Sequence, residues 1–347
     1  MTKIRIAAVG TGYFSRFQYA AWNRIEEAKV VAVCNRTLSG AQDVATTFGI
    51  GQVFDDFVEM LDTAKPDIVD VITPPATHLA YITEAAKRGV NVICQKPFCE
   101  DLNDAIKAVE VAEKANITLV IHENFRFQPW YSKLADEICD GQLGDLYQAQ
   151  FRLRPGDGQG PNAYLARQPY FQKMPRFLIH ETGVHWIDTF RYLFGEIVSV
   201  NAVLRRLNPA ISGEDAGLVA MEFESGLLAV LDGNRLSDHV AENRRLTMGE
   251  MMIEGSAGTL ALDGNANITM RPHGQNQAEQ RYYQWNDIDF GGDCVYRLQC
   301  HVIDSLTNNG PLMNTGREYL RNLIVEQAVY RAADENRTIR VDYSQVI

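Results

Sequence analysis

A carboxylate and an imidazole stand four residues apart in the segment ETGVH, at Glu181 and His185. In a helix, residues at this spacing lie on one face, and Asp188 and Tyr192 would fall on the same face. Neutral imidazole is abundant near pH 7, so His185 could remove the proton of a hydroxyl group. Glu181 could orient that imidazole or hold a neighbouring hydroxyl. The alternative is a solvated polar face, although such faces more often carry Lys, Glu and Gln.

A lysine closes the apolar run VNVICQKPF at residues 90–98. Pro97 cannot donate to a sheet, so a strand would end there and leave Lys96 at its carboxyl edge. In open α/β sheets, the strand ends line the ligand crevice. A lysine there could donate to a substrate oxygen and stabilise developing negative charge. A solvated lysine that merely ends a strand is the alternative.

A glycine loop, VGTGYFS at residues 9–15, follows the first apolar run. Gly10 would allow the tight turn, and Gly12 would let the backbone approach a pyrophosphate held at a helix N-terminus. Ser15 replaces the third glycine of GxGxxG, where a small residue suffices. Because the motif follows a strand and opens a helix, we expect nucleotide contacts. The candidate residues are Gly10, Thr11, Gly12, Tyr13 and Phe14.

The second predicted strand ends in Asn35, Arg36 and Thr37. Enzymes that use NAD usually carry an acidic residue here, which accepts from the ribose hydroxyls. Asn35 would not repel a 2′-phosphate, and Arg36 could pair with it or stack on adenine. The run is similar to the one that 6-phosphogluconate dehydrogenases use for NADP. We therefore favour NADP; NAD, with Arg36 as a solvated charge, is the alternative.

Strands and helices alternate through the first third of the chain, which predicts a doubly wound parallel sheet. Strands are predicted at 4–9, 30–34, 68–72, 90–94 and 118–121, and helices at 14–25, 39–48, 55–61, 76–88 and 102–115. The rhythm changes near residue 123. We therefore predict a Rossmann domain over 1–122 and an α+β domain over 123–347.

The second part begins with a helix at 130–140, a strand at 146–153, a polar loop at 154–175 and a helix at 181–194. Six strands joined by turn pairs then predict a large, mostly antiparallel open sheet. These strands are expected at 197–205, 217–223, 227–232, 252–254, 259–262 and 268–271. Closing helices are expected at 294–306 and 317–333, with a return to the first domain.

Composition narrows the classes of partner. The net charge of −11 and a pI near 5.2 argue against nucleic acid or an anionic membrane surface. No apolar run reaches the length of a membrane span. The six cysteines form no CxxC pair, so we expect reduced thiols, no metal and a cytoplasmic location.

The chain resembles the Gfo/Idh/MocA family of glucose–fructose oxidoreductases, inositol dehydrogenases and rhizopine catabolism proteins. The resemblance spans the whole chain and rests on the order of the glycine loop, ITPPATH at 72–78, VICQKP at 92–97, HENFRF at 122–127 and ETGVH at 181–185. It implies that Lys96 lies beside the nicotinamide and that Glu181 and His185 belong to the substrate side. It also implies a homodimer or homotetramer formed through the C-terminal sheet.

Two departures from the family pattern stand out. Gln95 replaces the usual Glu before Lys96, which removes a carboxylate that could pair with the lysine. Glu181 replaces an Asp often found four residues before the histidine.

Further candidate cofactor contacts at strand ends are Thr73, Pro74, His78, Gln95 and Asn124; His78 could instead cap the next helix. Candidate substrate contacts are Arg154, Gln172, Arg176 and Tyr192. Arg126 could pair with an acid between the domains, and His180 has no assigned role.

Together with these residues, the resemblance implies an NAD(P)-dependent oxidoreductase that moves hydride between the nicotinamide and a secondary alcohol or ketone. The substrate would be a sugar, a polyol such as an inositol, or a related compound. One alternative is a glycosidase that uses a bound nicotinamide for transient oxidation. Another is a non-enzymatic cofactor-binding regulator, which the presence of both Lys96 and His185 disfavours.

Overall fold

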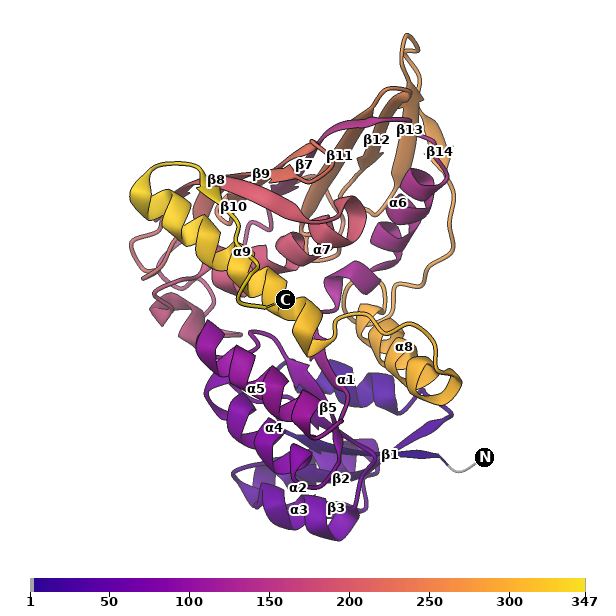
Figure 1. Cartoon of the computed structure of the whole chain (residues 1–347), viewed down its shortest axis with the longest axis vertical. Helices are drawn as coiled ribbons and strands as arrows, with labels where there is room; N and C mark the ends of the chain where they lie inside the picture. The colour runs from indigo at the N-terminus through magenta and orange to yellow at the C-terminus, as the bar shows by residue number, and fades with distance from the viewer. Residues whose placement is uncertain (1–2, 347) are drawn as a thin grey trace. The chain divides into compact units, whose positions relative to one another are not determined.

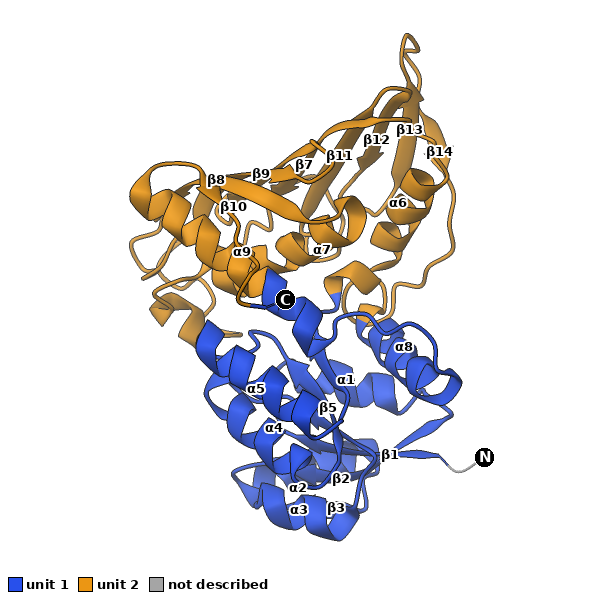
Figure 2. Ribbon diagram, in the orientation of Figure 1, with its two compact units in different colours: residues 1–124, 295–321, 346 blue, residues 125–294, 322–345, 347 orange. Residues whose placement is uncertain are grey.

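The computed structural model describes residues 3–346, which form two compact units. Of the described residues, the first comprises 3–124 and Val295–Arg321, and the second comprises Phe125–Cys294 and Asn322–Gln345, apart from a single residue near the C-terminus (Figure 2). Each unit has its own sheet. None of the helices within the described range is long and apolar enough to cross a membrane.

A six-stranded sheet forms the centre of the first unit, with all neighbouring strands parallel, in the order β3-β2-β1-β4-β5-β6 (Figure 1). This is the order of a doubly wound Rossmann sheet, so the predicted fold class is confirmed for this unit. The strands are β1 (Ile4–Val9), β2 (Ala28–Cys34), β3 (Gln52–Phe54), β4 (Ile68–Val71), β5 (Asn91–Gln95) and β6 (Leu119–His122). The helices are α1 (Ser15–Trp22), α2 (Leu38–Phe48), α3 (Phe57–Ala64), α4 (His78–Ala86), α5 (Leu102–Lys114) and α8 (Cys294–Asn308).

The strand order of this sheet reverses between β1 and β4, which is where ligands bind in doubly wound folds. The glycine loop leaves the carboxyl end of β1, and Thr73 and Lys96 follow the ends of β4 and β5. The sequence motifs therefore gather at one edge of one sheet.

The second unit is built on a nine-stranded sheet in the order β14-β13-β12-β11-β7-β10-β9-β8-β15 (Figure 1). All neighbours are antiparallel except β7 and β10, so the predicted mostly antiparallel sheet is also confirmed. The strands are β7 (Leu146–Leu153), β8 (Ile197–Arg205), β9 (Ala216–Phe223), β10 (Leu228–Asn234), β11 (Gly249–Gly255), β12 (Gly258–Leu262), β13 (Ile268–Pro272), β14 (Glu279–Arg281) and β15 (Ile339–Arg340).

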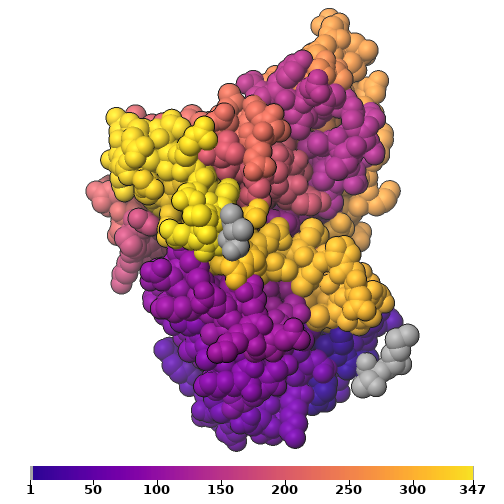
Figure 3. Space-filling model, viewed as in Figure 1, coloured from indigo at the N-terminus to yellow at the C-terminus, as the bar shows by residue number. Residues whose placement is uncertain are grey.

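Helices cover one face of this sheet: α6 (Pro129–Cys139), α7 (Val184–Phe194) and α9 (Gly316–Glu335), whose first turns belong to the first unit (Figure 1). Their apolar side chains, among them Trp130, Trp186 and Val329, pack with strand residues such as Phe151 and Leu231 in one buried core. The segment after α9 adds β15 beside β8, visible as yellow atoms next to salmon ones in Figure 3.

The other face of the sheet carries exposed apolar side chains. Val203, Leu218, Leu228 and Met252 are between 39% and 54% exposed. Each alternates along its strand with a buried residue, as expected when only one face of a sheet is packed.

The helix predicted over residues 181–194 is wrong at its start. A π-helix, η4 (Leu178–Gly183), precedes α7, so Glu181 lies in a wider turn than His185. Contacts outside the helix fix this turn, because the amides of Phe177 and Ile179 both donate to Glu214 Oε1 at 3.1 Å. Single π-turns inserted into helices are frequent at functional sites.

Three short strands were not predicted: β3, β14 and β15, of two or three residues each. All three lie at sheet edges and depend on pairing with a neighbour rather than on a long apolar pattern. The 154–175 segment was expected as loop throughout, and it contains the 3₁₀-helix η3 (Pro169–Lys173).

Candidate functional site

The glycine loop of the first unit has the backbone that phosphate binding requires. Gly10 has a φ of +111°, and a Cβ there would lie 2.4 Å from the carbonyl oxygen of Ile72, so only glycine fits. A Cβ at Gly12 would meet nothing within 4 Å, which leaves open space beside the loop backbone. Ser15 begins α1 and donates through Oγ to the carbonyl of Gly12 at 2.7 Å. Serine therefore closes the turn where the usual motif has its third glycine.

The loop after β2 forms a compact polar corner. Asn35 Nδ2 donates to Thr37 Oγ1 at 2.9 Å and to the Thr37 carbonyl at 3.1 Å. A Cβ on Gly40 would meet Asn35 Nδ2 at 2.8 Å and the hydroxyl oxygens of Thr11 and Thr37 at 3.1 Å. Gly40, which the sequence did not single out, thus lets the glycine loop and the loop after β2 approach each other. Arg36, between Asn35 and Thr37, is exposed.

His78 joins two turns at the carboxyl edge of the sheet. Its ring is buried, with Nδ1 2.7 Å from the carbonyl oxygen of Phe98 and Nε2 2.7 Å from that of Thr73. We expected His78 to touch the cofactor or to cap the next helix. The structure gives no side-chain cap on α4 and shows the imidazole spanning the turns that follow β4 and β5. Thr73 Oγ1 is further fixed by the hydroxyl of Thr77, at 2.7 Å.

Gln95 ends β5 and Lys96 directly follows it, and the Lys96–Pro97 peptide bond is cis. Gln95 Oε1 accepts from the backbone N–H of Lys96 at 2.8 Å. Both residues are partly exposed. Asn124 follows β6 and is 3% exposed, and its Nδ2 has no hydrogen-bond partner among residues 3–346.

These features fit a dinucleotide. The backbone around Gly10 and Gly12 can approach a pyrophosphate at the start of α1, and the corner at Asn35 and Thr37 offers oxygens near the end of β2, where the ribose binds in such folds. The unpaired amide of Asn124 is a donor suited to the polar end of such a ligand. By contrast, no group of three His, Cys, Asp or Glu side chains within residues 3–346 is placed to hold a metal ion.

In the second unit, Glu181 is held by a buried arginine. Arg235 Nη1 lies 3.4 Å from Glu181 Oε2 and donates at 2.5 Å to Thr182 Oγ1, which itself donates to Glu181 Oε2. The Arg235 side chain is 2% exposed. The other edge of its guanidinium group binds Asp157, with Nη2 2.8 Å from Oδ2. Burial alone would raise the pKa of Asp157, but Arg235 and Arg167 outweigh it and hold that pKa below its usual value. Glu181 is therefore an oriented carboxylate, 16% exposed.

His185, in the first turn of α7, lies flat against Phe125. The ring centroids are 3.8 Å apart and the planes differ by 1°. Phe125 in turn meets Trp186 edge-on, with centroids 5.3 Å apart. His185 is 5% exposed, so its imidazole is confined by an aromatic wall rather than left in solvent.

Asp188, expected on the same face as His185, is fully buried and serves as an anchor. Arg126 donates to both of its carboxylate oxygens, from Nη2 to Oδ1 at 2.6 Å and from Nε to Oδ2 at 2.8 Å. Asn322 Nδ2 donates to Oδ1 at 2.7 Å. Arg126 also lies over the Tyr192 ring, 5.4 Å from its centroid. Burial raises the pKa of Tyr192, so the phenol is neutral. Asp188, the acid that Arg126 holds here, belongs to the same unit as Arg126.

The other predicted substrate residues have partners within the second unit. Arg154 Nη2 pairs with Asp232 Oδ2 at 2.6 Å, and Gln172 Nε2 donates to the carbonyls of Pro161 and Ala163 at 2.9 and 2.8 Å. His180 Nδ1 lies 2.7 Å from Glu326 Oε1, which gives this unassigned residue an anchoring contact.

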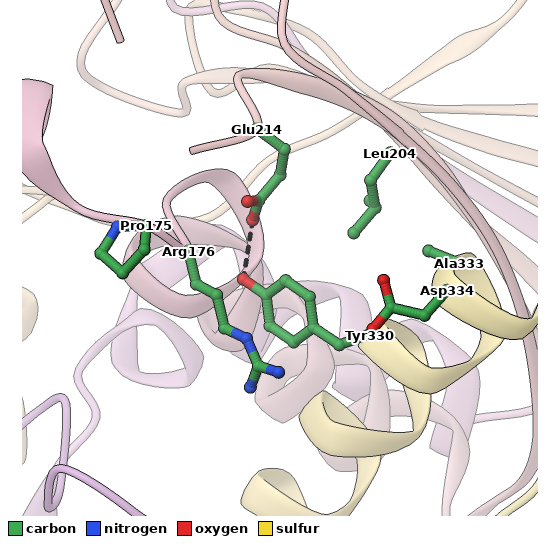
Figure 4. A pocket seen from close by; sticks show the side chains of 7 residues that line it. All are labelled: Pro175, Arg176, Leu204, Glu214, Tyr330, Ala333 and Asp334. Atoms are coloured by element: carbon green, nitrogen blue, oxygen red, sulfur yellow. Dashed lines mark hydrogen bonds between the residues drawn. The ribbon is translucent and has the colours of Figure 1, made fainter. Parts of the chain in front are cut away.

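Arg176 borders a cavity of about 280 Å³ (Figure 4). Its guanidinium lies over the Tyr330 ring, 4.2 Å from the centroid, and Tyr330 donates to Glu214 Oε1 at 2.7 Å. The cavity is lined by Pro175, Arg176, Leu204, Glu214, Tyr330, Ala333 and Asp334. Neither Glu181 nor His185 is among them, so the cavity is separate from the candidate catalytic side chains.

Arg235 and Asp157 are the main residues of this region that the sequence interpretation missed. Arg235 directly follows β10, just as Lys96 directly follows β5. The predicted strand stopped at Asp232, two residues short of the observed end at Asn234, which hid this relationship. Asp157 lies in an irregular segment where no periodicity marks a buried side chain.

Comparison with known proteins gives one consistent set of relatives. Residues 4–123 match an oxidoreductase family with an NAD-binding Rossmann fold, and residues 131–261 match the GFO/IDH/MocA C-terminal domain. D-apiose dehydrogenase of Paraburkholderia graminis is 32% identical over 346 residues, covering 96% of this chain and 89% of that protein. scyllo-Inositol 2-dehydrogenase (NAD(+)) of Bacillus subtilis is 28% identical over 256 residues, covering 71% and 72%.

Among solved structures, an oxidoreductase from Agrobacterium radiobacter, in complex with NAD⁺, L-tartaric acid and magnesium, has a TM-score of 0.89 and 26% identity. The match covers 98% of this chain and 99% of that one. The two-sheet architecture is thus shared over the full length.

Proposed function

Because the chain belongs to the Gfo/Idh/MocA family of oxidoreductases that act on CH–OH groups, we propose that it oxidises or reduces an uncharged sugar or polyol. The observation that carries the proposal is the placement of three motifs on neighbouring strands of one sheet. The glycine loop follows β1, the Thr73 turn follows β4 and Lys96 follows β5, all at the carboxyl edge where dinucleotides bind.

In the oxidative direction, the substrate loses a hydride from carbon and a proton from oxygen, and a carbonyl forms. A bound nicotinamide supplies the hydride acceptor. His185 accepts the hydroxyl proton, and Lys96 donates a hydrogen bond to the same oxygen and stabilises its developing negative charge. Glu181, oriented by Arg235, holds a neighbouring substrate hydroxyl or orients His185. In the reductive direction, Lys96 polarises the carbonyl and protonated His185 returns the proton.

An uncharged substrate is supported by the pairing of three arginines in the second unit with protein carboxylates. Arg126, Arg154 and Arg235 are at most 12% exposed, and each holds a protein carboxylate at 2.8 Å or less. A substrate carboxylate would have to displace one of these partners. Relatives named for D-apiose and inositol fit this reading.

For the cofactor, the proposal is NADP(H) in preference to NAD(H). Asn35 is neutral, and Arg36 is exposed at the end of β2, where the ribose of a bound dinucleotide lies in this fold. A guanidinium there would pair with a 2′-phosphate. Binding isotherms for both reduced cofactors measure the preference directly.

A homodimer or homotetramer through the open sheet face is also proposed. Val203, Leu218 and Leu228 expose apolar area on three neighbouring strands, and Met252 does so on β11 of the same sheet. Such patches commonly mark protein interfaces. Light scattering of the wild type and of Leu218→Lys tests this. The wild type should be oligomeric and the variant dissociated, whereas a monomeric wild type contradicts the proposal.

The test of activity is a spectroscopic screen. Purified protein is mixed with NAD⁺ or NADP⁺ and a panel that includes D-apiose, myo-inositol and matched sugar acids, and with the reduced cofactors and ketoses. Reduced nicotinamide should appear or disappear with neutral sugars or polyols. A protein that binds cofactor but turns over no panel member in either direction contradicts the proposed function, and turnover of acids alone contradicts the substrate class.

A further inference from the structure

The backbone N–H of Lys96 stands at one end of a chain of side-chain hydrogen bonds that leads into the core of the first unit. It donates to Gln95 Oε1 at 2.8 Å, and Gln95 Nε2 donates to Gln18 Oε1 at 3.1 Å. Gln18 Nε2 then donates to Asp70 Oδ1 at 2.9 Å, while Trp22 Nε1 donates to Asp70 Oδ2 at 2.8 Å. Gln18 and Asp70 are fully buried, and Trp22 is 1% exposed. These four hydrogen bonds, called the relay below, connect residues of α1, β4 and β5.

The sheet explains why these side chains meet. Asp70 pairs with Ile93 in the parallel ladder, and Gln95 lies two residues further along β5. Residues two apart in a strand point to the same face, so Asp70 and Gln95 share the face to which Gln18 of α1 is bonded.

Only one orientation of the two amides satisfies the relay. Both of its ends, the Lys96 N–H and the Trp22 indole, can donate but not accept. Gln95 must therefore present Oε1 to Lys96 and its NH₂ to Gln18, which in turn must present its own NH₂ to Asp70. The direction of every bond depends on a carboxylate at position 70 that accepts from both sides.

We propose that Asp70 and Gln18 are positioning residues, which hold Gln95 and the Lys96 peptide in the arrangement in which Lys96 acts; this rests on the proposed function. The single amide of Gln18 can serve one carboxylate, at position 70 or at position 95, but not at both. With Asp70 present, a neutral Gln95 is the side chain that completes the relay. The replacement of the family's usual Glu at position 95 is then coupled to Asp70.

Because the amide of Gln18 can serve only one carboxylate, two single substitutions should each disturb these hydrogen bonds, and their combination should restore them. In Asp70→Asn, the new amide keeps its oxygen for Trp22 and turns its NH₂ to Gln18, so both glutamines reverse and Gln95 places NH₂ against the Lys96 N–H. In Gln95→Glu, two carboxylates compete for one amide. In the double variant, the new carboxylate at position 95 accepts from both Gln18 and Lys96, and the relay is satisfied again.

The experiment is a double-mutant cycle with two readouts, performed at about pH 8. Burial raises the pKa of Asp70 to about 7, so this pH favours its ionised form. The first readout is hydrogen exchange of the Lys96 amide, which needs no turnover. The second is kcat and KM with the best substrate from the screen. Asp67→Asn, which removes an exposed carboxylate bonded to the Arg5 amide, is the matched control.

Each single variant should speed Lys96 exchange and lower kcat by about tenfold, with KM less affected, as for the loss of one hydrogen bond. The double variant should return both quantities to within about threefold of the wild type, and the control should change neither. If Asp70→Asn does not fold, Gln95→Met removes both amide contacts and should give the same losses.

Additive losses in the double variant, or unchanged Lys96 exchange in the single variants, would overturn the proposal. Exchange that couples while kcat does not would show a relay without influence on Lys96, which also overturns it. A wild type that turns over no substrate is a failure of the proposed function instead, and the exchange cycle alone then decides whether the relay exists.

Discussion

The imidazole of His185 and the ring of Phe125 lie parallel, with 3.8 Å between their centroids. Phe125 is in the short 3₁₀-helix η2 (Phe125–Phe127) and His185 in the first turn of α7, so the contact joins two segments 60 residues apart in the chain. The stacking fixes the plane of the imidazole through the face of the ring. It does not use the hydrogen-bonding positions of the ring nitrogens, which lie at the ring edge. A base that must meet one hydroxyl proton benefits from such a fixed plane.

Phe125→Leu should therefore lower kcat while leaving the fold intact. Loss of the stacked pair removes about 0.5–1.5 kcal/mol of orientation energy, which corresponds to a decrease of about 2- to 12-fold in kcat. Steady-state kinetics with the wild-type substrate provide the measurement. Phe194→Leu, a change of the same size on α7, is the control and should affect stability more than kcat. Equal kcat values for Phe125→Leu and wild type would mean that the stacking does not orient the base.

Arg235→Met should destabilise the second unit. The substitution leaves Asp157 without its main partner and Glu181 without Arg235, and breaking a buried ion pair from one side costs about 3–5 kcal/mol. Urea unfolding measures the loss. The pair of Arg244 with Asp238 is more than half exposed, so Arg244→Met should cost less than about 1 kcal/mol. Similar costs for the two variants would contradict the structural role given to Arg235.

The buried carboxyl of Asp70 should make stability depend on pH. Burial raises its folded pKa to about 7, against about 3.9 in an unfolded chain. Between these values the folded state binds more protons than the unfolded state, so the free energy of unfolding falls as pH rises from about 4 to about 7. The slope is at most about 1.4 kcal/mol per pH unit. The titratable neighbours Tyr19 and Cys94 stay neutral in this range, since burial raises both of their pKa values.

A second buried group acts in the opposite direction, so the comparison must be made between variants. Burial lowers the pKa of His122 to about 4, and its contribution to the free energy of unfolding therefore rises between about pH 4 and about 6.5. Urea unfolding of the wild type and Asp70→Asn across this range isolates Asp70. The stability difference, wild type minus variant, should decrease with pH; a constant difference would exclude a raised Asp70 pKa.

Arg36→Ala tests the cofactor preference. If Arg36 pairs with a 2′-phosphate, the substitution should weaken NADPH binding by about tenfold, as for one charge-assisted contact at an exposed site, and leave NADH binding nearly unchanged. Fluorescence titration of both cofactors gives the dissociation constants. Lys87→Ala, at an exposed pair with Glu84 in the same unit, should alter neither. Equal losses for the two cofactors would argue against 2′-phosphate recognition.

The sequence predicts the first unit well because its signals are local. Alternating apolar strands and helices, a glycine loop directly after β1 and a proline directly after Lys96 each follow from chain-neighbour rules. Such rules do not predict the short edge strands β3, β14 and β15. Two or three residues at a sheet edge become a strand only when a partner strand is present.

The candidate site shows the same division. Arg235 pairs with Asp157, 78 positions away, and Phe125 stacks on His185, 60 positions away. No local sequence pattern predicts either contact. The π-turn at Glu181 depends on Glu214, which comes from a distant loop. Residue types at strand ends could therefore be predicted, whereas the contacts that orient those residues required the fold.

We expect Lys96, at the end of β5, to take part in hydride transfer with a cofactor held by the first unit. The most direct measurement is kcat of Lys96→Met together with its cofactor dissociation constant. We predict a loss of at least about a hundredfold in kcat, as for removal of a group that stabilises developing charge, with cofactor affinity within about threefold of wild type. A variant that binds cofactor and keeps the wild-type kcat would contradict the account.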